Sequence, residues 1–154
     1  MTSNCIFCKI LKKEIPAFVL AETEHALAFM DVFPLSRGHC LVIPKVHGEK
    51  LHDLDEHVVA DMGRVLSRVS KAAMSDTYNV LQNNGKLAHQ EVPHVHFHLI
   101  PKYAEEEQAA KGKGLGIGWP NAKGDMDELK AVAEEIKARI AANAAAAPEA
   151  KKLA

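Results

Sequence analysis

The sequence has little of what marks several large protein classes. Among 154 residues only three are cysteines, aromatic residues make up 5%, and 19 Lys and Arg nearly balance 20 Asp and Glu. The formal net charge of −1 gives no general attraction for a nucleic acid backbone or an anionic membrane. No apolar run reaches the roughly 18 residues that cross a bilayer, and residues 1–16 lack the apolar segment of a secretory signal. We therefore expect no nucleic acid or membrane partner, and a cytoplasmic location with the nucleus as a second one.

What remains is a globular composition, with 47% hydrophobic and 25% charged residues. An odd number of cysteines argues against a disulfide framework and for a reducing compartment. We expect one domain over residues 1–141, which includes a charged and then Gly-rich mobile linker at 104–118. The Ala-rich tail at 142–154 offers no apolar face for packing and is expected to be disordered.

Hydrophobic periodicity predicts a mixed order of helices and strands. The longest pattern begins at Glu56, where apolar residues recur every three or four positions for about five turns. A final helix is expected after Asp125, which can cap it. The predicted strands cover residues 18–22, 26–30, 40–43 and 78–81, followed by the strand that contains residues 94–98. A hairpin, a strand, a long helix and two further strands favour an α+β fold with an antiparallel sheet.

The most informative stretch is HVHFHLIPK, which begins at residue 94 and places histidine at every second position. In a strand, alternate residues share a face, so His94, His96 and His98 are predicted to lie together, with the intervening apolar residues against a helix. The Cα atoms of the outer two would be roughly 13 Å apart. Three histidines on a straight strand therefore cannot all bind one ion, and the row must divide its roles.

One end of the row has partners for a metal ion. Cys5 and Cys8 have the C-x-x-C spacing that is common for two zinc thiolates, while His94 and His47 could complete a set of four ligands. Two buried thiols or a redox pair are the alternatives for these cysteines. A redox pair usually follows a strand, and none is predicted before Cys5.

The rest of the row suits nucleophilic chemistry. Ordinary core or surface histidines are the plain alternative, but each buried imidazole needs partners for two nitrogens, which makes three in a row an unusual core. A neutral imidazole is a good nucleophile at pH 7, and a phosphorylated imidazole is reactive enough to be hydrolysed in a second step. His98, next along the face, could then hydrogen-bond a phosphate oxygen.

HVHFHLIP resembles the signature of the histidine-triad family, and the resemblance extends over most of the chain. It includes the C-x-x-C opening at residues 5–16, the strand end at 28–31, the segment GHCLVIPKVH at 38–47 and the turn NNG at 83–85. Gly118-Trp119-Pro120 resembles the tryptophan segment of the nucleotide-binding, phosphoramidase branch. Only the Ala-rich tail lies outside the resemblance.

The resemblance implies a half-barrel α+β fold with a five-stranded antiparallel sheet, one long helix and a C-terminal helix. It also implies a homodimer in which two sheets join into one of ten strands. The activity implied is hydrolysis or transfer of nucleoside monophosphates through a covalent nucleotidyl-histidine on His96. His94 would orient this nucleophile through its backbone carbonyl. A structural Zn²⁺, not needed for the chemistry, would be held by Cys5, Cys8, His47 and His94.

The family pattern also implies a nucleotide site. Asp31 would accept hydrogen bonds from the ribose, and the phosphate would be held by Asn83, Gln90 and His98. Trp119 would lie near the active site of the partner subunit and screen the leaving group there. The base would lie among apolar side chains whose plain alternative is core packing, namely Ile6, Phe7, Ile10, Phe29 and Val32. For Asn83 and Gln90 the alternatives are a turn residue and an exposed loop amide.

This chain departs from the branch at Glu91, where Ser is common, and at Met30, where a polar residue is common. The resemblance as a whole implies an adenosine 5′-monophosphoramidase that releases AMP from P–N-linked amines. Because of Glu91, it does not define which amine is preferred as the leaving group. The alternatives are a dinucleoside polyphosphate hydrolase and a nucleotide-binding regulatory protein with incidental hydrolysis.

Overall fold

The computed structural model describes residues 4–118 and 124–146. The chain forms two units, Met1–Gly116 and Ile117–Ala154. The single domain expected over residues 1–141 stays a prediction. No helix in the described ranges is both long and apolar enough to traverse a bilayer.

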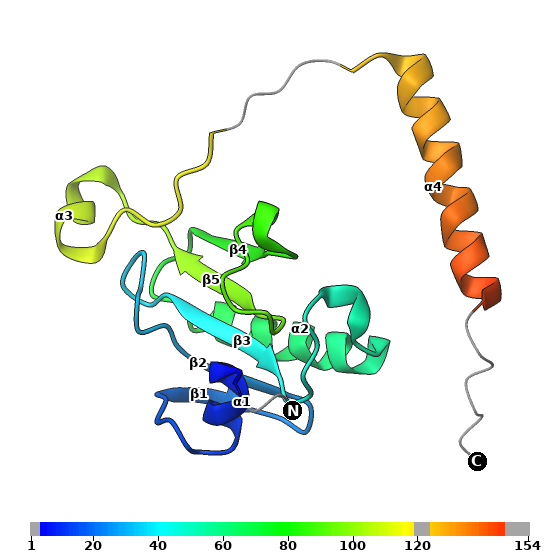
Figure 1. Ribbon diagram of the computed structural model, residues 1–154. Coiled ribbons are helices and arrows are strands. Elements are labelled where there is room, and N and C mark those ends of the chain that lie inside the picture. The colour runs from blue at the N-terminus through cyan, green and yellow to red at the C-terminus, as the bar shows by residue number, and fades with distance from the viewer. Residues whose placement is uncertain (1–3, 119–123, 147–154) are drawn as a thin grey trace. The chain divides into compact units, whose positions relative to one another are not determined.

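The first unit is built on a single antiparallel sheet (Figure 1). Its strands are β1 (Val19–Glu22), β2 (Ala26–Met30), β3 (Cys40–Pro44), β4 (Tyr78–Gln82) and β5 (Phe97–Pro101). They are arranged in the order β1-β2-β3-β5-β4, with every neighbouring pair antiparallel. The helices of this unit are α1 (Ile6–Leu11), α2 (Glu56–Lys71) and α3 (Gln108–Lys111), with 3-10 turns at Leu51–Asp53, Lys86–Ala88 and Glu105–Glu107. The predicted α+β fold is confirmed.

The two faces of the sheet carry different layers, with α1 on one face and α2 on the other (Figure 1). Alternation along the central strands separates their side chains between these layers. The α1 layer has a core that contains Phe7, Phe29 and Leu41. The α2 layer has a core that contains Val42 and Val95, packed against Val65 and its neighbours on the helix. The prediction that the apolar residues of the histidine row face a helix is confirmed for Val95 and Phe97.

The histidine row differs from the prediction in one respect, because β5 begins only at Phe97 and therefore includes His98 alone. The preceding residues bond elsewhere. The backbone N–H of Val95 donates to the carbonyl of Gly48 at 2.8 Å, and the His94 side chain occupies the carbonyl of Pro44 at 3.1 Å. The end of the row is thus attached to β3 by a side chain and to the loop after β3 by a single backbone bond, rather than by a strand ladder.

Two segments that are distant in sequence meet beside the start of β3. The N–H of Arg37 donates to the carbonyl of Lys111, and the N–H of Gly114 donates to the carbonyl of Leu35 at 3.1 Å. Gly112 has φ +85°, and a Cβ there would lie 2.6 Å from the carbonyl oxygen of Leu35, so only glycine fits. Residues 104–118, expected to be a linker, thus contain two short helical turns and backbone contacts; their mobility stays a prediction.

The second unit contains helix α4 (Met126–Ala146). Asp125 Oδ1 accepts from the N–H groups of Asp127 and Glu128 at 3.0 and 2.9 Å, which confirms the predicted cap. The helix extends into the expected tail, so residues 142–146 are helical, in keeping with the high helix propensity of alanine. The remainder of that tail, 147–154, lies outside the described residues.

Candidate active site and metal centre

The three histidines lie on the α1 side of the sheet, and their hydrogen bonds differ. The Nδ1 atom of His96 lies 2.7 Å from the backbone carbonyl of His94. A carbonyl can only accept, so Nδ1 of His96 carries the proton and the lone pair is on Nε2. The Nε2 atom of His94 lies 3.1 Å from the carbonyl of Pro44, so in that ring the lone pair is on Nδ1. Neighbouring rings therefore present lone pairs from opposite nitrogens.

Burial keeps these rings neutral. It lowers the pKa of His94 to about 4, with the bond to the Pro44 carbonyl opposing the shift. Burial also lowers the pKa of His98 to about 4, with further lowering by His96 and His39 and opposition from Asp31. The pKa of His96 is likewise lowered by burial, against the bond to the His94 carbonyl and the charge of Asp31. At pH 7 the row consists of neutral imidazoles, the form that acts as nucleophile or ligand.

The His94 end of the row is a four-residue cluster of soft and borderline ligands. The ligand atoms of Cys5, Cys8, His47 and His94 all lie within 4.8 Å of one another. His94 Nδ1 lies 3.4 Å from Cys5 Sγ, 3.7 Å from Cys8 Sγ and 3.2 Å from His47 Nδ1. Tetrahedral zinc with ordinary Zn–S and Zn–N bonds separates its ligand atoms by roughly 3.3–3.8 Å. These residues therefore fit a four-coordinate metal ion, and the side chains predicted to form a metal cluster are brought together.

The other end of the row opens on a cavity of about 350 Å³. Its polar wall contains His96, His98, Asp31 and Glu91. The Phe7 ring meets the His96 ring edge-on at a centroid distance of 5.2 Å. The remaining wall is apolar and includes all the residues predicted to surround the base, namely Ile6, Phe7, Ile10, Phe29 and Val32. The volume and the mostly apolar wall with few polar groups are typical of small-molecule sites.

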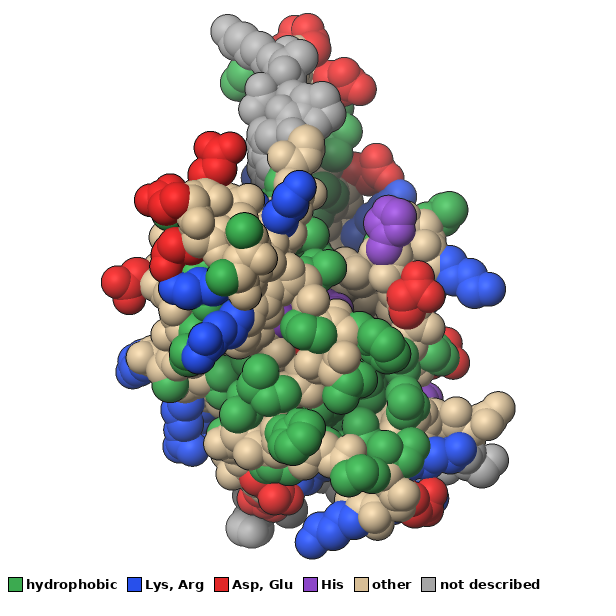
Figure 2. Space-filling model, turned by 90° about the vertical axis from the view of Figure 1, so that its left-hand side faces the viewer, with side chains coloured by type: hydrophobic (Ala, Val, Ile, Leu, Met, Phe, Trp, Pro, Cys, Tyr) green, Lys and Arg blue, Asp and Glu red, His purple; other side chains and the backbone are tan. Residues whose placement is uncertain are grey.

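The surroundings of this cavity are also apolar. Figure 2 shows hydrophobic side chains gathered over the lower half of one face, with charged side chains mostly toward its margins. Val32 and Phe33, which follow β2 and line the cavity, are 70% and 86% exposed. The cavity is thus bordered by apolar groups available to a flat, weakly polar ligand such as a nucleobase.

Two of the predicted nucleotide-binding residues, Asn83 and Gln90, are not at this wall. The Gln90 side chain accepts from the N–H of Gly85 at 2.6 Å and donates to the carbonyl of Glu49 at 2.6 Å. The Asn83 amide donates to the carbonyl of His89 at 3.2 Å. Both side chains thus stabilise the loop before the row, and their phosphate contacts stay a prediction. Trp119 lies outside the described residues.

One side chain was not predicted to have a role. His39 is 2% exposed, and its Nε2 atom lies 3.0 Å from His98 Nδ1 and 3.5 Å from Asp31 Oδ2. Strand alternation could have indicated its position, because His39 precedes Leu41 by two residues and therefore lies on the same face of the sheet. The pairing of Leu41 with His98, which brings His39 close, could not be read from either segment alone.

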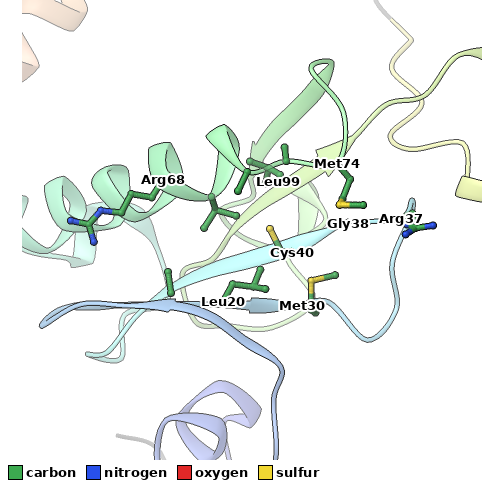
Figure 3. Close-up of a pocket in the computed structure, with 12 residues that line it drawn as sticks. Leu20, Met30, Arg37, Gly38, Cys40, Arg68, Met74 and Leu99 are labelled. Carbon is green, nitrogen blue, oxygen red and sulfur yellow. The ribbon is translucent and has the colours of Figure 1, made fainter.

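A separate cavity of about 430 Å³ lies between the end of α2 and the opposite face of the sheet (Figure 3). Leu20, Met30 and Leu99 contribute to its mainly apolar lining, and the Arg37 and Arg68 head groups extend away from it. Burial raises the pKa of the Cys40 thiol in its wall to about 11, with Asp31 adding to the shift, so this thiol is unreactive at neutral pH. His96 and His98 line the cavity at the end of the row, and no histidine lines this one.

Comparison with known proteins agrees with this arrangement. The HIT domain matches residues 12–105. Adenosine 5′-monophosphoramidase HNT1 of Saccharomyces cerevisiae is 52% identical over 140 residues, which is 91% of this chain and 85% of that protein. The structure of a hypothetical protein from Leishmania major is 54% identical with a TM-score of 0.81, covering 92% of this chain and 99% of that one. The structure of the histidine triad nucleotide-binding protein from Candida albicans is 44% identical with a TM-score of 0.79, covering 90% and 98%.

The chain therefore belongs to the HIT domain family. The resemblance drawn from HVHFHLIP is confirmed, as is the sheet architecture that it implied.

Proposed function

We propose that this protein is an adenosine 5′-monophosphoramidase, an enzyme that hydrolyses the P–N bond between AMP and an amine. The observation that carries the proposal is the 2.7 Å bond from His96 Nδ1–H to the His94 carbonyl, which leaves the Nε2 lone pair of a neutral ring at the wall of the cavity. Relatives with about half of their residues identical, in Saccharomyces cerevisiae and Schizosaccharomyces pombe, bear the name of this activity.

The reaction proceeds in two displacements. His96 Nε2 attacks phosphorus, the Nε2–P bond forms, the P–N bond breaks, and the amine nitrogen takes up a proton from a neighbouring donor. Glu91 lines the cavity and is our candidate for this donor in its acid form. Water then attacks phosphorus, the Nε2–P bond breaks, one proton passes to solvent, and AMP is released.

The substrate would bind by its nucleoside. The apolar wall around Phe7 and Phe29 would hold the base, and the Asp31 carboxylate would accept from the ribose hydroxyls. The carboxylate is held in place because its Oδ1 accepts from the N–H of Phe33 at 2.8 Å. His98 would donate to a phosphate oxygen.

We further propose that Cys5, Cys8, His47 and His94 hold a structural Zn²⁺. The support is the chemistry of the donor set and the separations of 3.2–3.7 Å from His94 Nδ1 to the other three ligand atoms. When bound, the ion supplies a cross-link between the start of α1, the segment after β3 and the residues before β5.

A homodimer is the proposed assembly. Strand β4, YNVLQ, lies at the edge of the sheet and carries no charged residue that would discourage pairing. Tyr78 and Val80 on this strand are 39% and 46% exposed. Pairing of two β4 strands would give the ten-stranded sheet that the family resemblance implies.

The decisive experiment is capture of the intermediate. The protein is mixed with an adenosine 5′-phosphoramidate, quenched in the first turnovers, digested and analysed by mass spectrometry. The expected result is AMP attached to His96. AMP on another residue, or turnover of diadenosine polyphosphates faster than of the phosphoramidate, would overturn the proposal.

A further inference from the structure

His39 lies outside the HVHFH row, yet both nitrogens of its ring have partners. Its Nδ1 accepts from the backbone N–H of Leu35 at 3.1 Å. Its Nε2 faces His98 Nδ1 at 3.0 Å, and the two rings are 5.2 Å apart between centroids. With 2% of its surface exposed, His39 has little opportunity to exchange these partners for water.

These two contacts fix the protons of both rings. A backbone N–H can only donate, so Nδ1 of His39 is the acceptor and Nε2 of the neutral ring carries the proton. That proton points to His98 Nδ1, which must therefore accept. The neutral His98 ring then carries its proton on Nε2, the nitrogen remaining for a ligand.

We propose that His39 is a positioning residue that sets the tautomer of His98, so that His98 presents an N–H donor to the phosphate while His96 presents a lone pair. This inference rests on the proposed function, because it names what the second ring does for the same reaction. A donor already oriented toward the position where charge develops requires no reorganisation during the reaction, which is the reason to fix it in advance.

The neighbouring loop holds His39 in this orientation. The His39 N–H donates to the Ser36 carbonyl at 3.0 Å, and the Ser36 hydroxyl donates to the Pro101 carbonyl at 2.6 Å. The Leu35 carbonyl accepts from the N–H of Gly114. The N–H of Leu35 that sets the His39 ring is thus part of a segment anchored at both β5 and the segment after α3.

A metal ion is the competing explanation, because Asp31, His39 and His98 also place one ligand atom each within 4.8 Å of one another. Binding through His39 Nε2 would require the proton on Nδ1, where it would face the N–H of Leu35, donor against donor. The 3.1 Å bond from Leu35 therefore disfavours a metal and favours the hydrogen bond between the two rings.

The direct test is the ¹⁵N spectrum of the histidine rings, in which protonated and unprotonated nitrogens have distinct shifts. Protein labelled with ¹⁵N-histidine is compared with His98→Gln, which identifies the His98 signals. We expect His98 in the wild type to be protonated at Nε2. Protonation at Nδ1 would overturn the proposal, as would a shift of these signals to a metal-bound pattern on addition of Zn²⁺ beyond one equivalent.

Variants of His39 add a kinetic test. His39→Leu removes the donor, whereas His39→Gln keeps an amide N–H near the position of Nε2. We expect kcat for phosphoramidate hydrolysis to fall about 10- to 100-fold in His39→Leu, the range for partners that orient a reacting group, and to recover largely in His39→Gln. The matched control is Ser75→Ala, which removes a part-buried hydroxyl that donates to the Lys102 carbonyl at 2.7 Å and has no bond to either ring or to the segment that holds His39. For this variant we expect less than about a threefold change.

The two readouts separate this proposal from the proposed function. If no nucleotide is found on His96, the proposed function fails. The positioning role still stands in that case if His98 is protonated at Nε2 only when His39 is present. If the intermediate forms normally and the His98 tautomer is the same in wild type and His39→Leu, the positioning role fails alone. Should His39→Leu not fold, the wild-type spectrum still decides.

Discussion

The two ends of the histidine row carry the same side chain in different surroundings. At the His94 end, the ring bonds a carbonyl through Nε2 and turns Nδ1 toward two cysteines and another histidine. At the His98 end, Nδ1 accepts from His39, and the ring lines a cavity beside a carboxylate. The comparison teaches that the partner of one ring nitrogen decides what the other nitrogen can do, so identical residues four positions apart have separate roles.

Substitution of His96, which lies between the two ends of the row, should have the largest effect on catalysis. His96→Ala is expected to lower kcat for phosphoramidate hydrolysis by roughly 10⁵- to 10⁶-fold, the scale for loss of a nucleophile. Single-turnover assays and titration with AMP measure this. AMP affinity should stay within about tenfold, and substantial residual turnover would show that the nucleophile lies at another position of the row.

Disabling the His94 end should affect stability rather than chemistry. A chelator is expected to lower the free energy of unfolding of the wild type by several kcal/mol, because metal affinity adds to folding. The double variant Cys5→Ser/Cys8→Ser should be destabilised already and insensitive to the chelator. Cys40→Ala, which removes a buried thiol outside the cluster, is the control and should respond to the chelator as the wild type does. An insensitive wild type would contradict a metal at this end.

Substitution of Asp31, which lies beside the His98 end of the row, should have an effect of intermediate size. Asp31→Asn is expected to lower kcat/KM about 10- to 100-fold, the range for a hydrogen bond to a charged group. Substrates lacking ribose hydroxyls provide the control, since the variant and the wild type should differ much less on them. An equal loss on both substrates would place the role of Asp31 at His39, 3.5 Å away, instead of at the ribose.

The last expected effect concerns acid, and it is small over any single pH unit. The pKa of His98 is about 4 in the folded state and near 6.5 in the unfolded chain, so the unfolded chain binds the proton first as pH falls. This contribution to stability is complete above pH 6.5 and is lost between pH 6.5 and 4, by up to about 1.4 kcal/mol per pH unit. Chemical unfolding at several pH values should show a shallower slope for His98→Gln than for the wild type. Equal slopes would contradict the low pKa.

The fold was largely predictable because hydrophobic alternation carries its signal locally. The hairpin of β1 and β2 and the helix α2 begin within a residue of the predicted positions. The grouping of the four candidate ligand side chains was also predictable, since C-x-x-C defines half of it and only a few histidines could complete it. The later start of β5 was not, because a side chain from His94 takes the place of a backbone partner at Pro44.

The active site was less predictable where it depends on contacts between strands. His39 and His98 are 59 positions apart, and only the pairing of β3 with β5 brings them together. The bonds of Gln90 to Gly85 and Glu49 likewise depend on loop conformation, which periodicity does not encode. Residue type indicated the chemistry, whereas the register of the sheet determined which pairs of residues perform it.

The glycine at position 112 extends the reach of this site along the chain. A methyl group there would press on the Leu35 carbonyl oxygen, and the amide of that same residue orients the ring of His39. The hydrogen bonds from Leu35 to His39 and from His39 to His98 therefore depend on Gly112 as well. This glycine lies 14 residues beyond His98 and lines none of the cavity wall. Mutational tolerance in this protein is accordingly set by which backbone groups a residue displaces as well as by its nearness to phosphorus.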